Sequence, residues 1–153
     1  MAIVTVTELK AGLAPRHCLL GLDLGSRTIG VAVADPAGIV ASPLETIRRR
    51  KFRDDAKALE RIIAAREAGG IILGLPVSMD GTEGPRCQST RQFADNLLGM
   101  IDIDIAFWDE RLSTSAVERF LVDEADMTRK RRAEVVDKMA AAYILQGALD
   151  SVG

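Results

Sequence analysis

Apolar residues occur in short runs near the start of the chain, and polar turn residues separate these runs. Residues 19–35 hold two apolar segments joined by a tight turn at Gly25-Ser26, which predicts an antiparallel pair of strands. Turn residues follow at 35–38, and residues 39–47 are expected to form a third strand. Pro43 has no backbone N–H to donate, so this strand is expected at an edge of the sheet.

The pattern then becomes an alternation of helices and strands. Apolar residues at helical spacing predict an amphipathic helix over residues 53–68, which Gly69-Gly70 is expected to end. Residues 71–76 are wholly apolar, as is typical of a central parallel strand covered on both faces. A helix is expected to begin at Gly84-Pro85-Arg86, and residues 103–108 alternate as a further strand.

Two more helices complete the pattern. Ser115 and Glu118 have the spacing of a capping box, although Ser113 or Thr114 would also serve as the cap. The polar residues 122–130 lack periodicity and are expected to form a mobile loop, and the last helix is expected from residue 132 onward. These elements predict an α/β fold, with a single domain built on a mixed five-stranded sheet and flanked by helices.

We assign this domain to residues 18–150 and treat residues 1–17 as an N-terminal extension. The extension is expected to form one or two helical turns, which Pro15 ends. His17 is the only histidine, and we expect it to lie on the surface or to pack against a neighbour instead of acting as a catalytic base.

Charge and composition narrow the classes of function. A chain of 153 residues is long enough for one domain with a sizeable core. Its formal net charge of -2 gives no general attraction to nucleic acid, so such a partner has to be bound by local basic clusters. Two basic runs are present, at residues 48–53 and 129–132, and each is also compatible with an ordinary solvated surface.

Cys18 and Cys87 are far apart and lack metal-ligand spacing, which indicates reduced, packed thiols of a cytoplasmic protein. No run of residues is long and apolar enough to span a membrane, and Glu8 and Lys10 interrupt the N-terminus where a signal peptide needs an apolar stretch. We therefore expect a cytoplasmic location without a membrane partner.

Asp23 lies in the middle of an apolar strand, where an ionised carboxylate is costly to desolvate unless a cation or several donors meet it. An Asp that caps a turn or faces water is the ordinary alternative. Gly21 and Gly25 flank Asp23 on its own face, however, and Gly30 lies in the next strand. The missing side chains leave space for a group to approach the backbone there.

Two further carboxylates occupy positions that packing does not explain. Glu110 follows the strand at 103–108, and open α/β sheets gather their ligands at the carboxyl ends of strands. Asp137 lies in a stripe of small apolar residues, although a partly exposed Asp paired with an Arg would also account for it. Together with Asp23 they form a candidate oxygen site that suits Mg²⁺ or Mn²⁺, as a pair of ions ~3.5–4 Å apart.

The predicted helix start at Gly84-Pro85-Arg86 is a candidate phosphate site. The helix dipole favours an anion there, and first-turn N–H groups and the Arg86 guanidinium are suitable donors. An ordinary junction between a strand, a loop and a helix is the alternative.

Four segments resemble motifs of the YqgF/RuvX family, which consists of resolvase-like nucleases with a ribonuclease-H-type fold that are linked to the trimming of pre-16S ribosomal RNA. The similarity extends from about Cys18 to Leu149, and Ser113 stands where the third motif usually has Thr. The phosphate-binding hairpin of actin-like ATPases and sugar kinases reads much like the first motif. The four segments are residues 21–35, 74–94, 109–114 and 137–146.

The resemblance implies a ribonuclease-H-like sheet with Asp23, Glu110 and Asp137 as catalytic acids and metal ligands. We predict that the nucleic-acid contacts come from arginines of these motifs and from the second basic run: Arg27, Arg86, Arg91, Arg111, Arg129, Lys130, Arg131 and Arg132. The leading hypothesis is a metal-dependent nuclease that processes the 5′ end of pre-16S rRNA in the precursor of the small ribosomal subunit.

Three other functions remain open from the sequence. An actin-like ATPase needs two such domains, and 153 residues hold one. A phosphate-binding RNA factor with weak catalysis would share the same residues. A Holliday-junction resolvase acting on branched DNA has to cut two strands symmetrically and therefore needs a two-fold dimer.

Overall fold

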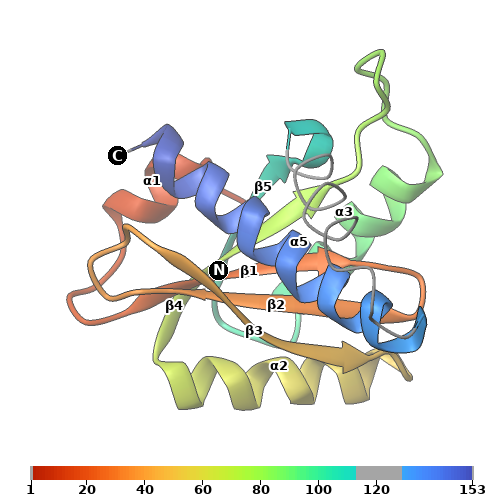
Figure 1. The fold of residues 1–153 in the computed structure, drawn as a ribbon. Coiled ribbons are helices and arrows are strands. Elements are labelled where there is room, and N and C mark those ends of the chain that lie inside the picture. Colours follow the sequence, from red (N-terminus) through yellow and green to blue (C-terminus); the bar gives the residue numbers. More distant parts are fainter. Residues whose placement is uncertain (1, 113–128, 153) are drawn as a thin grey trace.

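The computed structural model describes the backbone of residues 2–112 and 129–152, and the side chains of residues 2–111 and 138–152. A five-stranded sheet lies at its centre, with helices on both faces (Figure 1). The strands follow the order β3-β2-β1-β4-β5, in which β1, β2 and β3 pair antiparallel and β1, β4 and β5 pair parallel. The mixed five-stranded sheet is thereby confirmed. The strands are β1 (Cys18–Leu24), β2 (Thr28–Ala34), β3 (Ala41–Arg48), β4 (Ala68–Leu75) and β5 (Asp104–Asp109).

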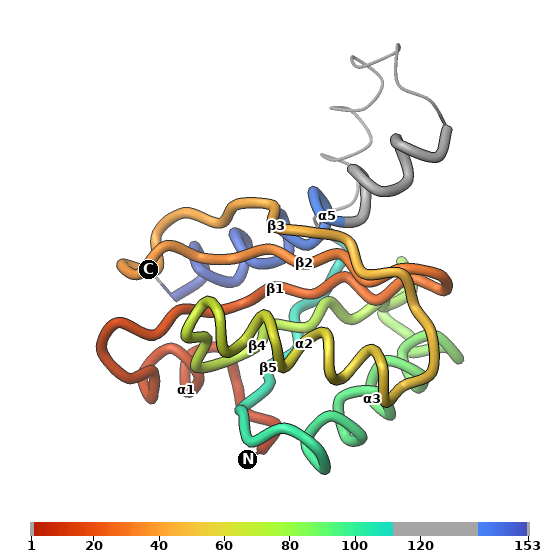
Figure 2. The backbone as a smooth tube through the Cα atoms, turned by 90° about the horizontal axis from the view of Figure 1, so that it is seen from below, coloured from red at the N-terminus to blue at the C-terminus, as the bar shows by residue number. Residues whose placement is uncertain are grey.

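Helices cover both faces of the sheet. Figure 2 shows α2 and α3 on one side of the strands and α5 on the other. Their apolar faces bury two separate clusters against the sheet, which is the layered arrangement that these helical patterns require. The helices are α1 (Val6–Ala11), α2 (Phe52–Arg66), α3 (Pro85–Leu98), the short 3₁₀ helix η1 (Glu110–Leu112) and α5 (Arg129–Ser151).

The edge position of β3 and the central position of β4 agree with the sequence pattern. Pro43 lies in β3, which among the described strands pairs with β2 alone. In β4, Leu73 faces the cluster under α2 and α3, whereas Ile72 faces the cluster under α5. Both side chains are fully buried, as a strand with no solvent-facing side requires.

The end of α2 differs from the prediction. Glu67, and neither glycine, takes the left-handed conformation that ends the helix, with φ 53°, while Gly69 and Gly70 are already part of β4. A Cβ atom at Gly70 would lie 2.5 Å from Leu9 Cδ1, and one at Gly69 would lie 2.6 Å from Leu13 Cδ1. The two glycines therefore admit the N-terminal segment against β4, a role that local helix signals do not report.

The N-terminal segment packs on the sheet through α1. A capping box begins this helix, in which Thr5 Oγ1 accepts from Glu8 N–H and Glu8 Oε1 accepts from Thr5 N–H. The helix ends at Gly12, earlier than the Pro15 stop that the sequence suggested. Leu9 is buried, and Ile3 forms a parallel bridge with Ile105 of β5. His17 is exposed.

The helix α5 lies close to the middle of the sheet because small residues face each other there. A Cβ atom at Gly21 would lie 2.7 Å from Leu145 Cβ and 2.8 Å from the Ala141 carbonyl oxygen. The helix begins at Arg129, three residues before the predicted start. The Ser115 capping box and the loop up to residue 128 lie outside the described residues. Among the helices of the described ranges, none has the length and apolar character to cross a membrane.

Candidate active site

The parallel strands β1, β4 and β5 bring two of the predicted carboxylates together at their carboxyl ends. Asp23 is the penultimate residue of β1, and Glu110 follows β5 directly as the first residue of η1. The two carboxyl groups are linked by a hydrogen bond. Residues 87 positions apart in the sequence thus meet at the edge where open α/β sheets bind their ligands.

Gly74 makes this meeting possible. It lies in β4, the strand between β1 and β5, and the Glu110 side chain crosses above it. A Cβ atom at Gly74 would lie 2.6 Å from Glu110 Oε1 and 2.5 Å from Ile144 Cδ1. Only a residue without a side chain leaves room for Glu110 between the sheet and α5. The sequence places Gly74 within an apolar run but gives no sign of this role.

The paired carboxyl groups have unusual electrostatics. The pKa of Asp23 is raised from its ordinary 3.8 to about 8. Burial is the largest cause, and the hydrogen bond to Glu110 and the negative charge of Glu110 also contribute. The positive charge of Arg86 opposes this shift. Near neutral pH the pair therefore holds a proton because a second negative charge is not compensated at this position.

These properties fit a site for a divalent cation. A cation next to the two groups would supply the missing positive charge, and carboxylate oxygens are the ligands that Mg²⁺ and Mn²⁺ prefer. Among the side chains that the structure describes, no cluster of three potential ligands occurs. The Asp137 side chain lies outside that set, although its backbone belongs to α5, one turn before Ala141. Asp137 as third ligand therefore stays a prediction.

Arg86 lies at the start of α3, in the position expected for a phosphate contact. Gly84 caps the helix without a side chain, and Pro85 occupies the first turn. The N–H groups of Cys87 and Gln88 both donate to the Gly84 carbonyl, at 3.1 and 3.2 Å, so fewer first-turn donors remain than the sequence suggested. The exposed guanidinium of Arg86 is thus the main donor at this end of α3.

The other predicted nucleic-acid contacts divide into three groups. Arg91 forms a two-pronged ion pair with Glu83, at 2.7 and 2.9 Å, and Arg111 pairs with Asp109 at 2.6 Å, so carboxylates on the same surface hold both. Arg27 is exposed in the turn between β1 and β2. The side chains of residues 129–132 lie outside the described set.

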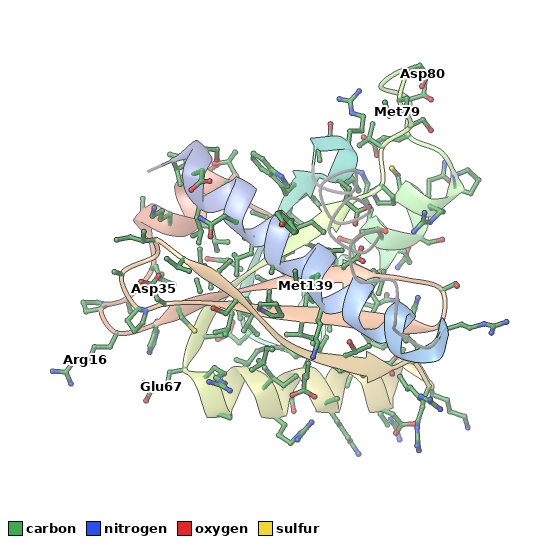
Figure 3. All side chains as sticks on the ribbon, viewed as in Figure 1. Arg16, Asp35, Glu67, Met79, Asp80 and Met139 are labelled. Carbon is green, nitrogen blue, oxygen red and sulfur yellow. The ribbon has the colours of Figure 1, made fainter. Side chains whose placement is uncertain are left out.

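A loop projects from this edge of the sheet between β4 and α3. Figure 3 shows Met79 and Asp80 at its tip, and the Met79 side chain is 85% exposed. Asp80 Oδ1 accepts from the backbone N–H and the hydroxyl of Thr82, at 3.0 and 2.7 Å, and these bonds lower the pKa of Asp80. These bonds hold the tip of the loop in a local turn.

Arg49 is a residue of the site region that sequence reasoning counted only as part of a basic run. Its Nη1 donates to the Gly25 carbonyl at 2.7 Å, and its Nε lies 3.9 Å from Asp55 Oδ2. Arg49 therefore fixes the turn that follows Asp23. Asp55 is buried in the first turn of α2, where a carboxylate requires a cationic neighbour. Because this burial arises only in the folded chain, the sequence contains no signal for this role of Arg49.

The fold is ribonuclease-H-like and of the resolvase type. Its defining features are the order of the strands in the mixed sheet, α5 on one face and the carboxylates at the carboxyl ends of the strands. Two solved structures share it: Thermus thermophilus RuvC in complex with a Holliday junction substrate (TM-score 0.54, 11% identity, 90% of this chain and 96% of that one) and the fowlpox virus resolvase with substrate Holliday junction DNA (TM-score 0.54, 9% identity, 88% and 98%). At such identities the likeness concerns the fold alone.

The family model of RuvX, described as Holliday junction resolvase, matches residues 17–151, and the chain belongs to this family. Close relatives extend over nearly its whole length. A protein of Phenylobacterium zucineum is 64% identical over 151 residues, covering 98% of this chain and 97% of the relative. One of Ruegeria pomeroyi is 63% identical over 150 residues, covering 98% and 97%. Both relatives bear the name "Putative pre-16S rRNA nuclease".

Proposed function

We propose that this protein is a metal-dependent nuclease that hydrolyses phosphodiester bonds of RNA at the 5′ end of pre-16S rRNA. The observation that carries the proposal is the contact between Asp23 and Glu110 across Gly74, because it builds an acidic, partly buried site at the ligand-binding edge of the sheet. The names of the relatives support the RNA substrate. The thiols of Cys18 and Cys87 are free and buried, which is consistent with a protein that acts in the cytoplasm.

In this proposal Asp23 and Glu110, with Asp137 from α5, hold a pair of Mg²⁺ or Mn²⁺ ions. When bound, such ions activate the attacking water and stabilise the negative charge on the leaving oxygen. Arg86 binds a phosphate of the same strand through its guanidinium and orients that strand toward the carboxylates. Asp23 and Glu110 would hold the cations as carboxylates, so the pair would give up the proton that the raised pKa of Asp23 retains in the metal-free protein.

Cleavage of four-way DNA junctions is the second candidate, because the description of the family model names this substrate. Symmetric cleavage of two strands requires a two-fold dimer. Solution mass, measured by light scattering in the presence and absence of a junction, therefore separates a dimeric resolvase from a monomeric RNA-processing enzyme.

The test of the proposal is a parallel incubation of the protein with a pre-16S 5′-leader RNA and with a four-way DNA junction, each with and without Mn²⁺. Mn²⁺-dependent cutting of the RNA is expected, and it should be lost in the Asp23→Asn variant. Cutting of the junction alone would establish the second candidate. Tight RNA binding without cutting under every metal condition would instead identify an RNA-binding factor.

A further inference from the structure

We infer that the groove between α2 and α3 binds an unpaired nucleobase of the RNA strand, at the same end of the sheet as the carboxylates. This inference rests on the proposed nuclease function and adds a subsite to it. The groove has a volume of about 490 Å³ and is open to solvent. The helices α2 and α3 cover the face of the sheet opposite α5 (Figure 2). Side chains that bear flat faces or amide groups line it: Arg49, Phe52, Gln88, Gln92, Phe93 and Asn96.

One wall of the groove is suited to stacking. Phe52 is partly exposed and meets Phe93 edge to face, with ring centroids 5.5 Å apart and an interplanar angle of 85°. The guanidinium of Arg49 lies over the Phe93 ring, 5.8 Å from its centroid. An aromatic ring and a planar cation are the two surfaces on which single-stranded bases stack in proteins.

The other wall presents a row of amides. Gln88, Gln92 and Asn96 follow each other at intervals of four residues on α3, so they lie along one face of the helix, and all three are exposed. Gln92 Nε2 donates to Asn96 Oδ1 at 2.9 Å, whereas the Gln88 amide has no hydrogen-bond partner among the described residues. Each amide offers both a hydrogen-bond donor and an acceptor, so it can pair with the donors and acceptors on the edge of a base.

Asp55 holds Arg49 in position beside this groove. Its side chain is 2% exposed, and Oδ1 accepts from the Arg50 N–H at 2.9 Å. Its Oδ2 is buried without a hydrogen-bond partner and lies 3.9 Å from Arg49 Nε. Asp55 therefore acts as a positioning residue, because its charge keeps the guanidinium over the Phe93 ring and against Gly25.

The groove lies at the same end of the sheet as the carboxylates, but on the opposite face. Arg49 Nη1 donates to the carbonyl of Gly25, which follows β1 directly, and Gln88 lies in the first turn of α3, the helix that Arg86 helps to begin. Residues 50, 51 and 53 of the first basic run adjoin Arg49 and Phe52 in the sequence, and their exposed side chains are available to the phosphates of the same strand. The two phenylalanine rings stand beside amides and a guanidinium, and this combination of stacking surfaces with donors and acceptors favours a nucleotide over an apolar protein segment.

The test compares two RNAs that share one hairpin stem, of which one carries an unpaired 5′ extension and the other is blunt. Binding is measured by fluorescence anisotropy in EDTA, so that cleavage does not interfere. The Gln88→Ala/Gln92→Ala variant should lose roughly 5- to 50-fold in affinity for the extended RNA and keep its affinity for the blunt one. Its salt dependence should be unchanged, because neither amide contacts a phosphate.

Two further variants complete the design. Phe52→Leu keeps apolar volume in the core but removes the stacking face, and it should show the same selective loss. Thr7→Ala, a neutral change on the exposed face of α1, should bind both RNAs like the wild type. Thermal melting checks that each variant is folded.

The outcomes separate this inference from the function on which it rests. Equal affinities of wild type and both groove variants for the extended RNA would overturn the subsite, even if Mn²⁺-dependent cleavage of the leader RNA persists. Selective loss of binding without cleavage by the wild type would support the subsite and contradict the nuclease. Failure of the wild type to bind either RNA would overturn both.

Discussion

At the scale of single residues, Asp23 determines how the stability of the metal-free protein depends on pH. Its pKa is raised from 3.8 to about 8 in the folded state, so the folded chain keeps a proton that the unfolded chain has released. The stabilising contribution of the neutral carboxyl group is complete below about pH 4 and is lost as the pH rises toward 8. This is the reverse of the usual behaviour of a carboxylate.

Asp23→Asn should therefore abolish cleavage and flatten this pH dependence. We expect the metal-free variant to gain about 1–3 kcal/mol over the wild type at pH 8 and much less at pH 5, allowing for the partial solvent exposure of the group. Thermal melting at both pH values in EDTA measures the difference. A wild-type protein that melts no earlier at pH 8 than the variant would contradict the raised pKa.

Gly74→Ala tests whether the space above β4 holds Glu110 in place. The added Cβ atom would lie within 2.6 Å of Glu110 Oε1 and Ile144 Cδ1, so either the carboxylate or α5 has to move. We expect a loss of about 1–3 kcal/mol of stability together with most of the Mn²⁺ affinity. Gly12→Ala is the control, because φ is −87° there and the nearest atom, Glu8 O, is 3.4 Å away. Its melting temperature and Mn²⁺ binding should match the wild type.

Arg86→Ala separates phosphate binding from metal binding. The variant should bind RNA more weakly and bind Mn²⁺ almost normally, because Arg86 provides a guanidinium and not an oxygen ligand. Arg86→Lys should restore RNA binding only in part, since an ammonium group lacks the two parallel donors. An Mn²⁺ titration and an RNA-binding curve on each variant provide the measurement. Equal losses in both would remove Arg86 from the phosphate site.

At the scale of elements, local signals predicted most of the sheet. The apolar runs indicated the strands, Pro43 indicated the edge, and Gly84-Pro85 indicated the start of α3. The stop of α2 was wrong because Gly69 and Gly70 serve packing with Leu9 and Leu13, which are distant in sequence. The same limit applies to the site: Asp23 and Glu110 were visible as misplaced charges, whereas Gly74 and Arg49 act through contacts that only the folded sheet creates.

The close packing of α5 on the sheet is the reason that we predict Asp137 as the third carboxylate of the site. Gly21 admits the helix at Ala141 and Leu145, and Asp137 lies one turn before Ala141. Asp137→Asn should abolish cleavage and leave the fold intact, because Asn keeps the volume and removes the charge. Asp150→Asn, an exposed change near the end of the same helix, is the matched control and should cut at the wild-type rate. Full activity of the Asp137 variant, or its unfolding, would exclude Asp137 from the site.

At the scale of the whole molecule, the net charge of -2 means that RNA has to be attracted locally. The second basic run lies in the first turn of α5, the helix that also carries Asp137. We therefore expect RNA affinity that falls steeply with salt although the protein is acidic. Each phosphate contact with single-stranded RNA contributes ~0.7 to the slope of log K against log salt.

Replacement of Arg129, Lys130, Arg131 and Arg132 by Ala should weaken RNA binding and reduce that slope by up to ~0.7 for each phosphate that the protein no longer binds. The measurement is a series of anisotropy titrations at increasing KCl in EDTA. Lys10→Ala/Arg16→Ala is the control, since it removes positive charge from the N-terminal segment, where Figure 3 shows Arg16 far from the loop that carries Asp80. If both variants change the slope equally, overall charge governs binding and the run on α5 is a solvated surface.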